Sequence, residues 1–431
     1  MMSQPKVSFY NLAWRWHFYA GLFVAPFMVM LALTGTLYLF KPQLDPLMYG
    51  NLMNVPAGHH SLSADDMLGR VQAAYPKGQV TQYLPAVDAE RSAQFVVKTA
   101  DSELNVFVDP YRGEILGDQD AKYNLQAIAR AIHGELMIGT VGDRLVEMAA
   151  GWGVVLVVSG LYLWWPRGQA AGILWPRLSS RGRVLWRDLH AVTGFWGASL
   201  LLVMLLSGMT WTGFWGKQYA EVWNKFPDAM WNDMPKSDLE ARSLNTATRQ
   251  TVPWAVENTP MPMSGDHAEH MAHGGAHAGP AAPTVSLQEV QNIAEQRKVE
   301  PGYSITLPTT DTGVFTIAVF ADDPRNDATL HVDQYSGKVL ADVRWEQYGP
   351  VARATELGVM LHEGKMFGTL NQIIVLLICL MILLSAVSGV VIWWKRRPQG
   401  RFGVPPLRHD LPTWKTGVAI MLALAVVFPL V

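Results

Sequence analysis

Residues 133–165 read HGELMIGTVGDRLVEMAAGWGVVLVVSGLYLWW, and residues 362–394 read HEGKMFGTLNQIIVLLICLMILLSAVSGVVIWW. The two stretches align without a gap, because each starts with a histidine and then carries Gly-Thr, Ser-Gly and Trp-Trp at identical spacings. Each also holds an apolar run, at Leu145–Trp165 and Ile373–Trp394, close to the roughly 20 residues that a helix needs to cross a bilayer. The stretches therefore predict two membrane-spanning helices that are copies of one unit.

Two other apolar runs, Phe18–Phe40 and Leu189–Trp215, repeat in the same manner. A histidine stands beside the start of each run, with one glycine four residues after it and a second glycine eighteen residues after it. The chain is therefore predicted to consist of two similar halves with two spans each. The residues of this second repeat are His17, Gly21 and Gly35 in the first half and His190, Gly194 and Gly208 in the second.

Composition and charge indicate how the chain lies in a membrane. Half of the 431 residues are hydrophobic and 16% are charged, against about 25% in soluble domains. Lys and Arg concentrate in the short segments that follow the second and fourth spans, which predicts that these segments and the N-terminus are cytoplasmic. The long segments then lie in the periplasm, and the protein is a multi-pass protein of a bacterial inner membrane. A fifth run, Gly417–Val431, is shorter and contains Pro429.

The two long segments between the spans also repeat each other. Residues 61–75 and 286–297 are each predicted to form a helix, the second opened by a Ser-x-x-Glu capping box. Short alternating runs follow each helix and end in an Asp-x-Tyr-x-Gly turn, at 109–113 and 333–337, where glycine supplies the positive φ of the turn. Each long segment thus predicts a helix packed on a small antiparallel sheet.

These helix-and-sheet segments, with their Asp-x-Tyr-x-Gly turns and flanking histidine-bearing spans, resemble the PepSY domains of the PepSY-associated transmembrane-helix family. The resemblance covers residues 10 to 397. That family includes iron-regulated membrane proteins and siderophore reductases of the inner membrane, so the resemblance implies a role in iron acquisition. The expected fold class is an α-helical membrane protein with duplicated halves: a four-helix transmembrane bundle, a fifth C-terminal helix and two periplasmic α+β PepSY-like domains.

The boundaries of these parts follow from the apolar runs and the charged segments between them. They are an N-terminal tail with the first span (1–40), a first periplasmic domain (41–131), the second span (132–166), a cytoplasmic loop (167–187), the third span (188–216), a second periplasmic domain (217–356), the fourth span (357–394), a second cytoplasmic loop (395–412) and a fifth span (413–431).

The four repeated histidines are the candidate functional residues. Both halves run through the membrane in the same direction, so their equivalent residues lie at equal depth. His17 is then expected beside His190 near the cytoplasm, and His133 beside His362 near the periplasm. Two imidazoles that face each other at one level are what the axial positions of a haem iron require, and helix bundles commonly host such cofactors.

Two haem b groups, each with two histidine ligands, are the cofactors that this pattern predicts. Gly21 and Gly194 lie one helical turn beyond their histidines, where the missing Cβ would leave room for a flat macrocycle. A single histidine at the end of a span more often contacts backbone or the membrane interface, so from the pattern alone a structural role stays open. The resemblance favours haem, since the corresponding histidines of the siderophore reductases bind it.

A His- and Met-rich loop in the second half has no counterpart in the first. Its side chains suit copper or another soft-to-borderline metal, although a disordered linker of drifted composition explains the loop at least as well. The candidate ligands are His267, His270, His273 and His277, with Met261, Met263 and Met271.

Motifs that the chain lacks narrow the function further. It has no Gly-rich dinucleotide or phosphate loop and no His-Glu-x-x-His motif, so a membrane quinol or a separate cytoplasmic reductase is the expected electron donor. The net charge of −2 gives no reason to expect a nucleic acid partner. The predicted function is a haem-containing reductase that passes electrons across the membrane to a ferric siderophore or another metal complex, with Cu(II) as a variant. The alternative is a non-catalytic membrane protein that binds or regulates a periplasmic partner such as a protease.

Overall fold

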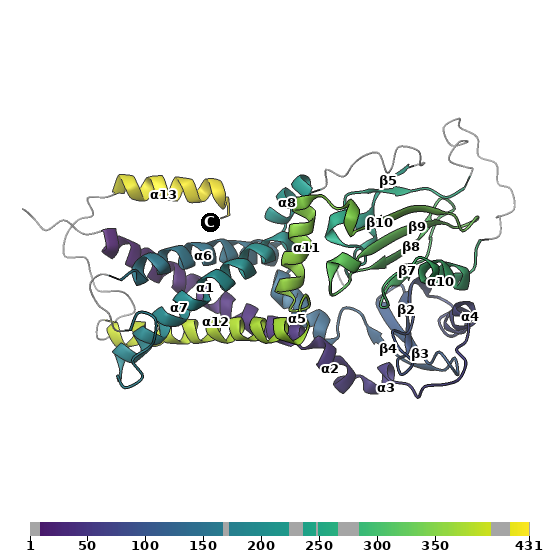
Figure 1. The fold of residues 1–431 in the computed structure, drawn as a ribbon, viewed down its shortest axis with the longest axis horizontal. Coiled ribbons are helices and arrows are strands. Elements are labelled where there is room, and N and C mark those ends of the chain that lie inside the picture. The colour runs from purple at the N-terminus through teal and green to yellow at the C-terminus, as the bar shows by residue number, and fades with distance from the viewer. Residues whose placement is uncertain are drawn as a thin grey trace, which may run out of the picture.

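A computed structural model describes residues 9–166, 172–223, 236–246, 249–265, 284–397 and 414–430. The chain has two parts, a bundle of long helices and an α+β part that joins one end of the bundle (Figure 1).

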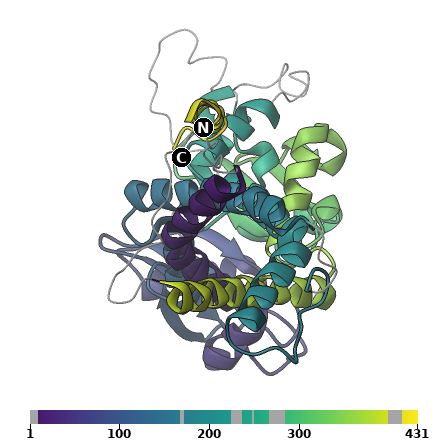
Figure 2. The ribbon, with the colours of Figure 1, turned by 90° about the vertical axis from the view of Figure 1, so that its left-hand side faces the viewer.

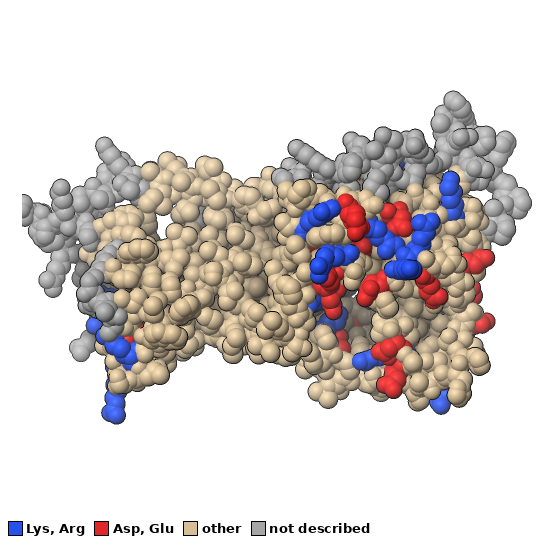
Figure 3. All heavy atoms as spheres, viewed as in Figure 1, with Lys and Arg blue, Asp and Glu red and all other residues tan. Residues whose placement is uncertain are grey.

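Four long helices form the bundle: α1 (Phe9–Leu39), α6 (Thr140–Trp164), α7 (Arg183–Gly208) and α12 (Thr369–Arg396). α6 and α12 each pack on both α1 and α7, so the four close into a ring that Figure 2 shows end-on. Each is long and apolar enough to cross a bilayer, and apolar side chains such as Leu22 and Leu377 face outward. Charged side chains crowd the α+β part and are scarce on the flank of the bundle in Figure 3. The chain is therefore a multi-pass membrane protein with four spans.

The predicted second and fourth spans each divide into two helices. They were expected to start at residues 132 and 357, but the membrane-spanning helices begin at Thr140 and Thr369. The residue immediately before each membrane-spanning helix is a glycine with a positive φ. The angle is +65° at Gly139 and +55° at Gly368, and glycine adopts such values at little cost. The preceding short helices are α5 (Leu125–Glu135) and α11 (Pro350–His362). The histidines of this repeat therefore lie on α5 and α11 at the end of the bundle, and not in the spans.

The last helix, α13 (Trp414–Val427), has 14 residues. At 1.5 Å per residue it is about 21 Å long, shorter than the hydrocarbon layer of about 30 Å. Within the described ranges, only the four bundle helices meet the length and composition of a span. Of the predicted fifth span at 413–431, residues 413 and 431 lie outside the described residues; the described helix ends just before Pro429, which cannot donate a helical hydrogen bond.

One antiparallel sheet of eight strands runs through the α+β part, in the order β10-β9-β8-β7-β1-β2-β3-β4. Each half supplies four strands, and the halves meet where β1 pairs with β7, with Tyr83 opposite Ile305. The two expected sheets are thus joined edge to edge, which removes an open edge from each. The strands are β1 (Gln79–Leu84), β2 (Ala93–Lys98), β3 (Glu103–Val108), β4 (Ile115–Asp120), β7 (Ser304–Thr306), β8 (Val314–Val319), β9 (Ala328–Asp333) and β10 (Val339–Arg344).

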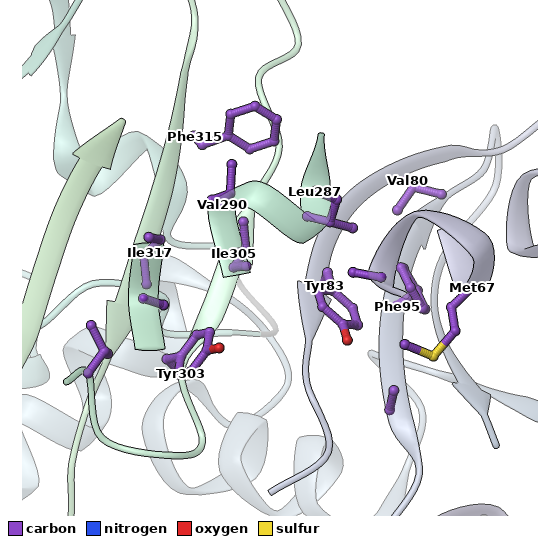
Figure 4. Packing of buried hydrophobic residues seen from close by; sticks show 14 of the residues in the cluster. Met67, Val80, Tyr83, Phe95, Leu287, Val290, Tyr303, Ile305, Phe315 and Ile317 are labelled. Atoms are coloured by element: carbon purple, nitrogen blue, oxygen red, sulfur yellow. The ribbon is translucent and has the colours of Figure 1, made fainter. Parts of the chain in front are cut away.

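Two helices, α4 (Ala64–Ala74) and α10 (Leu287–Gln296), cover the face of this sheet that is turned away from the bundle (Figure 1). Both were predicted, and α10 opens with the expected capping box. Apolar side chains of both halves meet beneath them in a single core, in which Tyr83, Phe95 and Ile305 are at most 2% exposed (Figure 4). Full burial of each such side chain contributes roughly 1.5–3 kcal/mol, so the two halves stabilise each other.

The opposite face of the sheet, which looks toward the bundle, carries buried polar side chains. Gln82 donates from Nε2 to the hydroxyl groups of Ser304 and Thr306 at 3.0 and 3.3 Å. Asn105 on β3 and Thr316 on β8 are also polar and buried. Since side chains alternate between faces along a strand, these residues interleave with those of the core. The polar face and the end of the bundle border the region in which the candidate site lies.

Candidate functional site: two histidine pairs

The four repeated histidines lie in two pairs. His17 of α1 and His190 of α7 have ring centroids 6.2 Å apart and ring planes inclined at 82°. His133 of α5 and His362 of α11 have centroids 6.4 Å apart and planes inclined at 88°. We name them the sheet-distal pair and the sheet-proximal pair, respectively. These are the two combinations that the internal repeat predicts.

Each histidine presents Nδ1 to a hydroxyl group on a neighbouring long helix. The hydroxyl groups also donate to carbonyl oxygens of their own helices, as Thr34 does to Met30 at 2.8 Å. Each hydroxyl oxygen can therefore only accept a hydrogen bond from the histidine, so the proton of the imidazole is on Nδ1. The Nδ1–hydroxyl distances are 2.9 Å for His17 with Ser159, 2.9 Å for His133 with Thr34, 3.0 Å for His362 with Ser207 and 3.2 Å for His190 with Ser388.

His190 supports the same proton placement independently. Its Nδ1 lies 3.0 Å from the carbonyl oxygen of Ser385, and a carbonyl oxygen can only accept. With the proton on Nδ1, Nε2 keeps its lone pair. A hydrogen bond of this kind sets the tautomer and the orientation of histidines that ligate metals. An imidazole in this tautomer has at Nε2 the lone pair that a metal ion could accept.

A glycine follows each of the four hydroxyl residues and lies against the histidine that the hydroxyl binds. We call the four units Thr34-Gly35, Ser159-Gly160, Ser207-Gly208 and Ser388-Gly389 the docking dipeptides. A side chain at any of these glycines would press on the imidazole ring. The distance from an added Cβ to the histidine Cε1 is 3.2 Å for Gly35 with His133, Gly160 with His17 and Gly208 with His362, and 3.5 Å for Gly389 with His190.

The docking dipeptides include residues that the sequence pattern alone does not single out. Thr34 and Ser207 are the hydroxyl residues that the pattern misses. A Ser/Thr-Gly dipeptide that recurs four times at matching positions could have identified them. Gly21 and Gly194, by contrast, contact no histidine. A Cβ at Gly21 would lie 3.8 Å from Leu156, and one at Gly194 would meet no described atom within 4 Å. The room that these two glycines would leave for a macrocycle stays a prediction.

The arrangement of spans, pairs and sheet corresponds to a known family. The family described as PepSY-associated TM region matches residues 14–396 of the chain. The chain belongs to this family. The match includes both histidine pairs, all four docking dipeptides and every strand of the eight-stranded sheet. No curated protein matches this PepSY-associated chain.

In this PepSY-associated chain the two pairs occupy opposite levels of the bundle. Thr34, the partner of His133, follows His17 by seventeen positions on α1, which corresponds to about 25 Å of helix. The interior between them is an apolar cluster against which Trp152 packs. Trp196, the other aromatic residue near this path, is half-exposed and donates from Nε1 to a loop carbonyl oxygen at 2.9 Å. It therefore lies at the surface of the bundle and not between the pairs.

A buried carboxylate anchors the helix that carries His190. Asp188 is fully buried two residues before His190 and accepts hydrogen bonds in ion pairs with Arg177 at 2.6 Å and Arg187 at 3.0 Å. Arg177 belongs to the connection between α6 and α7, so these ion pairs tie the connection to α7. A carboxylate in such a place is stable only while its cationic partners remain.

Trp211 joins the sheet-proximal pair to the α+β part. It lies in the short 3₁₀ turn after α7, with its ring centroid 5.4 Å from His362. The centroid of Trp211 also lies 5.4 Å from that of Trp254, in the short helix η4 (Trp254–Val256). Both contacts are edge-to-face, the arrangement that aromatic rings favour. A row of three rings thus leads from the pair toward the α+β part.

The predicted metal loop lies mainly outside the described residues, including His267, His270, His273, His277 and Met271. Met261 is described, and it is buried in the core beside η4, where it contacts apolar side chains. Within the described ranges no three His, Cys, Asp or Glu side chains are close enough to share a metal ion.

Proposed function

We propose that this chain is a haem-containing reductase of the bacterial inner membrane. His17 and His190 would ligate one haem b, and His133 and His362 a second. Electrons from a quinol or a separate cytoplasmic reductase would pass through both to a ferric complex in the periplasm. The observation that carries the proposal is the separation of the rings within each histidine pair.

That separation fits coordination of one iron by two imidazoles. An iron at about 2 Å from a nitrogen of each ring, with each ring centre about 1.2 Å behind its nitrogen, would hold the centroids roughly 6.4 Å apart. The pairs measure 6.2 and 6.4 Å. The internal repeat reproduces this spacing at both levels of the bundle, with the ring planes inclined at 82° and 88°.

The surroundings of the rings fit the same group. The docking dipeptides hold the Nδ1 protons, which leaves Nε2 as the ligand atom and raises its basicity. Their glycines let each ring approach the neighbouring helix, and apolar side chains pack together in the interior between the two levels. Haem iron supplies one-electron chemistry when it is bound. The protein supplies ligands, orientation and a dry path.

The orientation of the chain rests on its basic residues. They gather at the end of the bundle away from the sheet, which by the positive-inside rule is the cytoplasmic end. The α+β part would then be periplasmic, and the sheet-proximal pair would be the site from which electrons leave. Trp211 covers this pair on the side of the α+β part. The basic residues are Arg177, Arg181, Arg183 and Arg187 between α6 and α7, and Lys395, Arg396 and Arg397 at the end of α12.

The substrate would be a ferric complex such as a ferric siderophore. Oxygen-rich chelators hold Fe(III) as a hard cation, and one-electron reduction to Fe(II) weakens that binding. The chelator would thus release iron without being degraded. Membership of the PepSY-associated family and the resemblance to siderophore reductases favour this substrate class.

An optical spectrum of the purified protein, produced with ample haem, tests the proposal. We expect a b-type reduced-minus-oxidised signal and about two haems per chain by pyridine haemochrome assay. His17→Ala and His133→Ala should each remove about half of the signal, because each destroys one bis-histidine site. His59→Ala, which changes an exposed histidine, is the matched control and should keep all of it. A chain without haem under these conditions would instead favour a non-catalytic protein that binds a periplasmic partner.

A further inference from the structure

Glu356 is a fully buried carboxyl group on α11, the short helix that carries His362. This helix stands between the bundle and the sheet (Figure 1). Glu356 precedes His362 by six residues, which corresponds to about 9 Å along the helix axis. Acidic side chains are almost never fully buried unless they are paired, so the surroundings of Glu356 decide what this group can do.

One oxygen of this carboxyl group joins α11 to η4. Oε1 of Glu356 accepts a hydrogen bond from the backbone amide of Ala255 at 2.8 Å. The preceding residue, Trp254, is in contact with Trp211, and Trp211 is in contact with His362, with ring centroids 5.4 Å apart in both cases. The contacts therefore form a closed set. Glu356 and His362 lie on one helix and are also connected through η4 and the two tryptophans.

The other oxygen of the carboxyl group lacks such a contact. In the described part of the chain, Oε2 accepts no hydrogen bond, and no Lys, Arg or His side chain lies within ion-pair distance of Glu356. Asp327 is similar, and it directly follows the short helix η5 (Pro324–Asn326), which packs on α11. It is 1% exposed, Oδ1 accepts from the amide of Ala321 at 2.9 Å, and Oδ2 accepts from no described group. A carboxylate ion without a cation is very unfavourable in such a place, whereas a neutral carboxyl group is tolerated.

The acidic groups around Glu356 favour its protonated form further. Burial raises the pKa of Glu356 well above its ordinary value, and the charge of Asp327 adds to the shift, while the amide of Ala255 opposes it. Glu257, beside η4, and Glu363, directly after α11, raise this pKa as well. Burial also raises the pKa of Asp327 to about 8. A proton is therefore held between acids that border α11.

Among the described residues, the other titratable side chains packed against α11 bring no cation to this carboxyl group. Tyr348, directly after η6 (Trp345–Gln347), and Tyr219 of α8 (Trp215–Trp223) are phenols that are neutral at pH 7, because burial raises the pKa of both. Arg353 of α11 donates instead to a backbone carbonyl oxygen of η6 at 2.9 Å. The end of α7 that packs on α11 carries no charged residue.

We propose that Glu356 is a proton-binding positioning residue for the haem at the sheet-proximal pair. Its neutral carboxyl group holds η4 in place, and with it the row of rings from Trp254 through Trp211 to His362. Loss of the proton would place an unpaired negative charge in this closed set of contacts. The inference rests on the proposed function and adds to it that the electron leaving this pair is linked to a proton on Glu356.

The proton and the electron balance at this site. An electron that enters the pair lowers the local positive charge by one, which favours a proton from water on Oε2 of Glu356. When the electron leaves for the ferric acceptor, the proton returns to water, and only the O–H bond breaks. A unit charge that appears at this range in a protein interior changes a redox equilibrium by roughly tenfold. The reduction potential of the sheet-proximal haem should therefore fall as the pH rises through the range in which Glu356 loses its proton.

Redox potentiometry of protein with a single haem tests this link. In a His17→Ala background the sheet-proximal haem remains, and its potential is followed optically from mildly acidic to alkaline pH. Glu356→Gln keeps an acceptor for the amide of Ala255 but has no proton to lose, so it should keep the potential at acidic pH and abolish the fall at alkaline pH. Glu356→Leu removes the acceptor and should shift the potential at every pH. An unchanged pH dependence in Glu356→Gln would overturn the proposal.

Two controls locate the proton. In a His133→Ala background, which keeps the sheet-distal haem alone, Glu356→Gln should leave the potential unchanged at every pH; an equal effect on that haem would overturn the proposal. Asp327→Asn removes a like charge and should move the fall in potential to lower pH without abolishing it. Complete loss of the pH dependence in Asp327→Asn would assign the proton to Asp327 and overturn the role of Glu356.

Thermal unfolding of the full-length protein without haem separates this inference from the proposed function. The folded chain holds a proton on Glu356 that the unfolded chain loses above its ordinary pKa of 4.5, so the free energy of unfolding should fall as the pH rises. Glu356→Gln should flatten this fall, and Glu300→Gln, which changes an exposed glutamate, should not. Equal pH profiles in the wild type and Glu356→Gln would overturn the inference whatever the haem content. A flattened profile in a chain that binds no haem would keep Glu356 as a proton site and refute the proposed function.

Discussion

The replacement of Gly35 by alanine is a sharp test of the docking dipeptides, because its geometry can be worked out in advance. The added Cβ would lie 3.2 Å from Cε1 and 3.7 Å from Nδ1 of His133. Ordinary carbon contacts lie at about 3.5–4.0 Å, so the ring or α5 has to retreat by roughly 0.5 Å. Metal–ligand distances tolerate deviations of only about 0.2 Å. The substitution therefore displaces a ligand by more than coordination allows.

The polypeptide itself should tolerate the change. Alanine is favoured over glycine inside a helix by about 1 kcal/mol, and crowding of a packed site costs typically 1–3 kcal/mol. These terms largely cancel, so the free energy of unfolding of the haem-free protein should shift by no more than about 2 kcal/mol. Haem at the sheet-proximal pair should be bound 10- to 100-fold more weakly, as is usual when the support of a metal ligand is disturbed.

Haem content per chain and reduced-minus-oxidised spectra measure the effect. Gly35→Ala and Gly208→Ala should remove the same half of the signal, and Gly160→Ala the other half. Gly389→Ala should be milder, since its Cβ would lie 3.5 Å from His190. Gly69→Ala in α4, where a Cβ meets nothing within 4 Å, is the control. Full haem content and an unchanged spectrum in Gly35→Ala would refute the reasoning that the dipeptide positions a ligand.

Two further predictions concern the macrocycle and the sheet. Gly194→Ala meets no described protein atom within 4 Å, so it should leave the unfolding of haem-free protein unchanged but lower haem retention at the sheet-distal pair; equal retention would remove Gly194 from the cofactor site. Burial lowers the pKa of His331 to about 4. As the pH falls from 6.5 to 4, this histidine is therefore protonated in the unfolded chain before it is protonated in the folded one. The free energy of unfolding of the α+β part should fall by about 3 kcal/mol over this range. Above pH 6.5 this contribution is fully present, and His331→Gln should flatten the dependence in thermal unfolding followed between pH 4 and 8; an unchanged pH profile in the variant would contradict the assignment.

Much of the local structure follows from the sequence because it depends on neighbours in the chain. The capping box of α10 needs only Ser286 and Glu289 three residues apart, and it forms as expected. The turn at 333–337 needs Asp333 to accept from the amides of Tyr335 and Ser336, with a positive φ at Gly337, and it does so. Each is settled within a few residues, where spacing alone determines which atoms can meet.

The histidine pairs are an intermediate case. The repeat fixes that equivalent residues share a depth, which is enough to expect His17 beside His190 and His133 beside His362. It does not fix which neighbouring helix turns toward each ring. Gly21 lies on the same helix face as His17 by period, yet the glycine that touches this ring is Gly160 of α6. The rotation of one helix against another depends on packing across the whole bundle.

By itself the sequence determined the four long spans, two equivalent halves and the pairing of histidines by level, because hydrophobic length and internal repetition are properties of the chain alone. Only the tertiary structure decided that β1 and β7 join two sheets into one and that short helices carry His133 and His362. Strand edges do not encode their partners, and residues more than 200 positions apart meet only through the packing of every element between them.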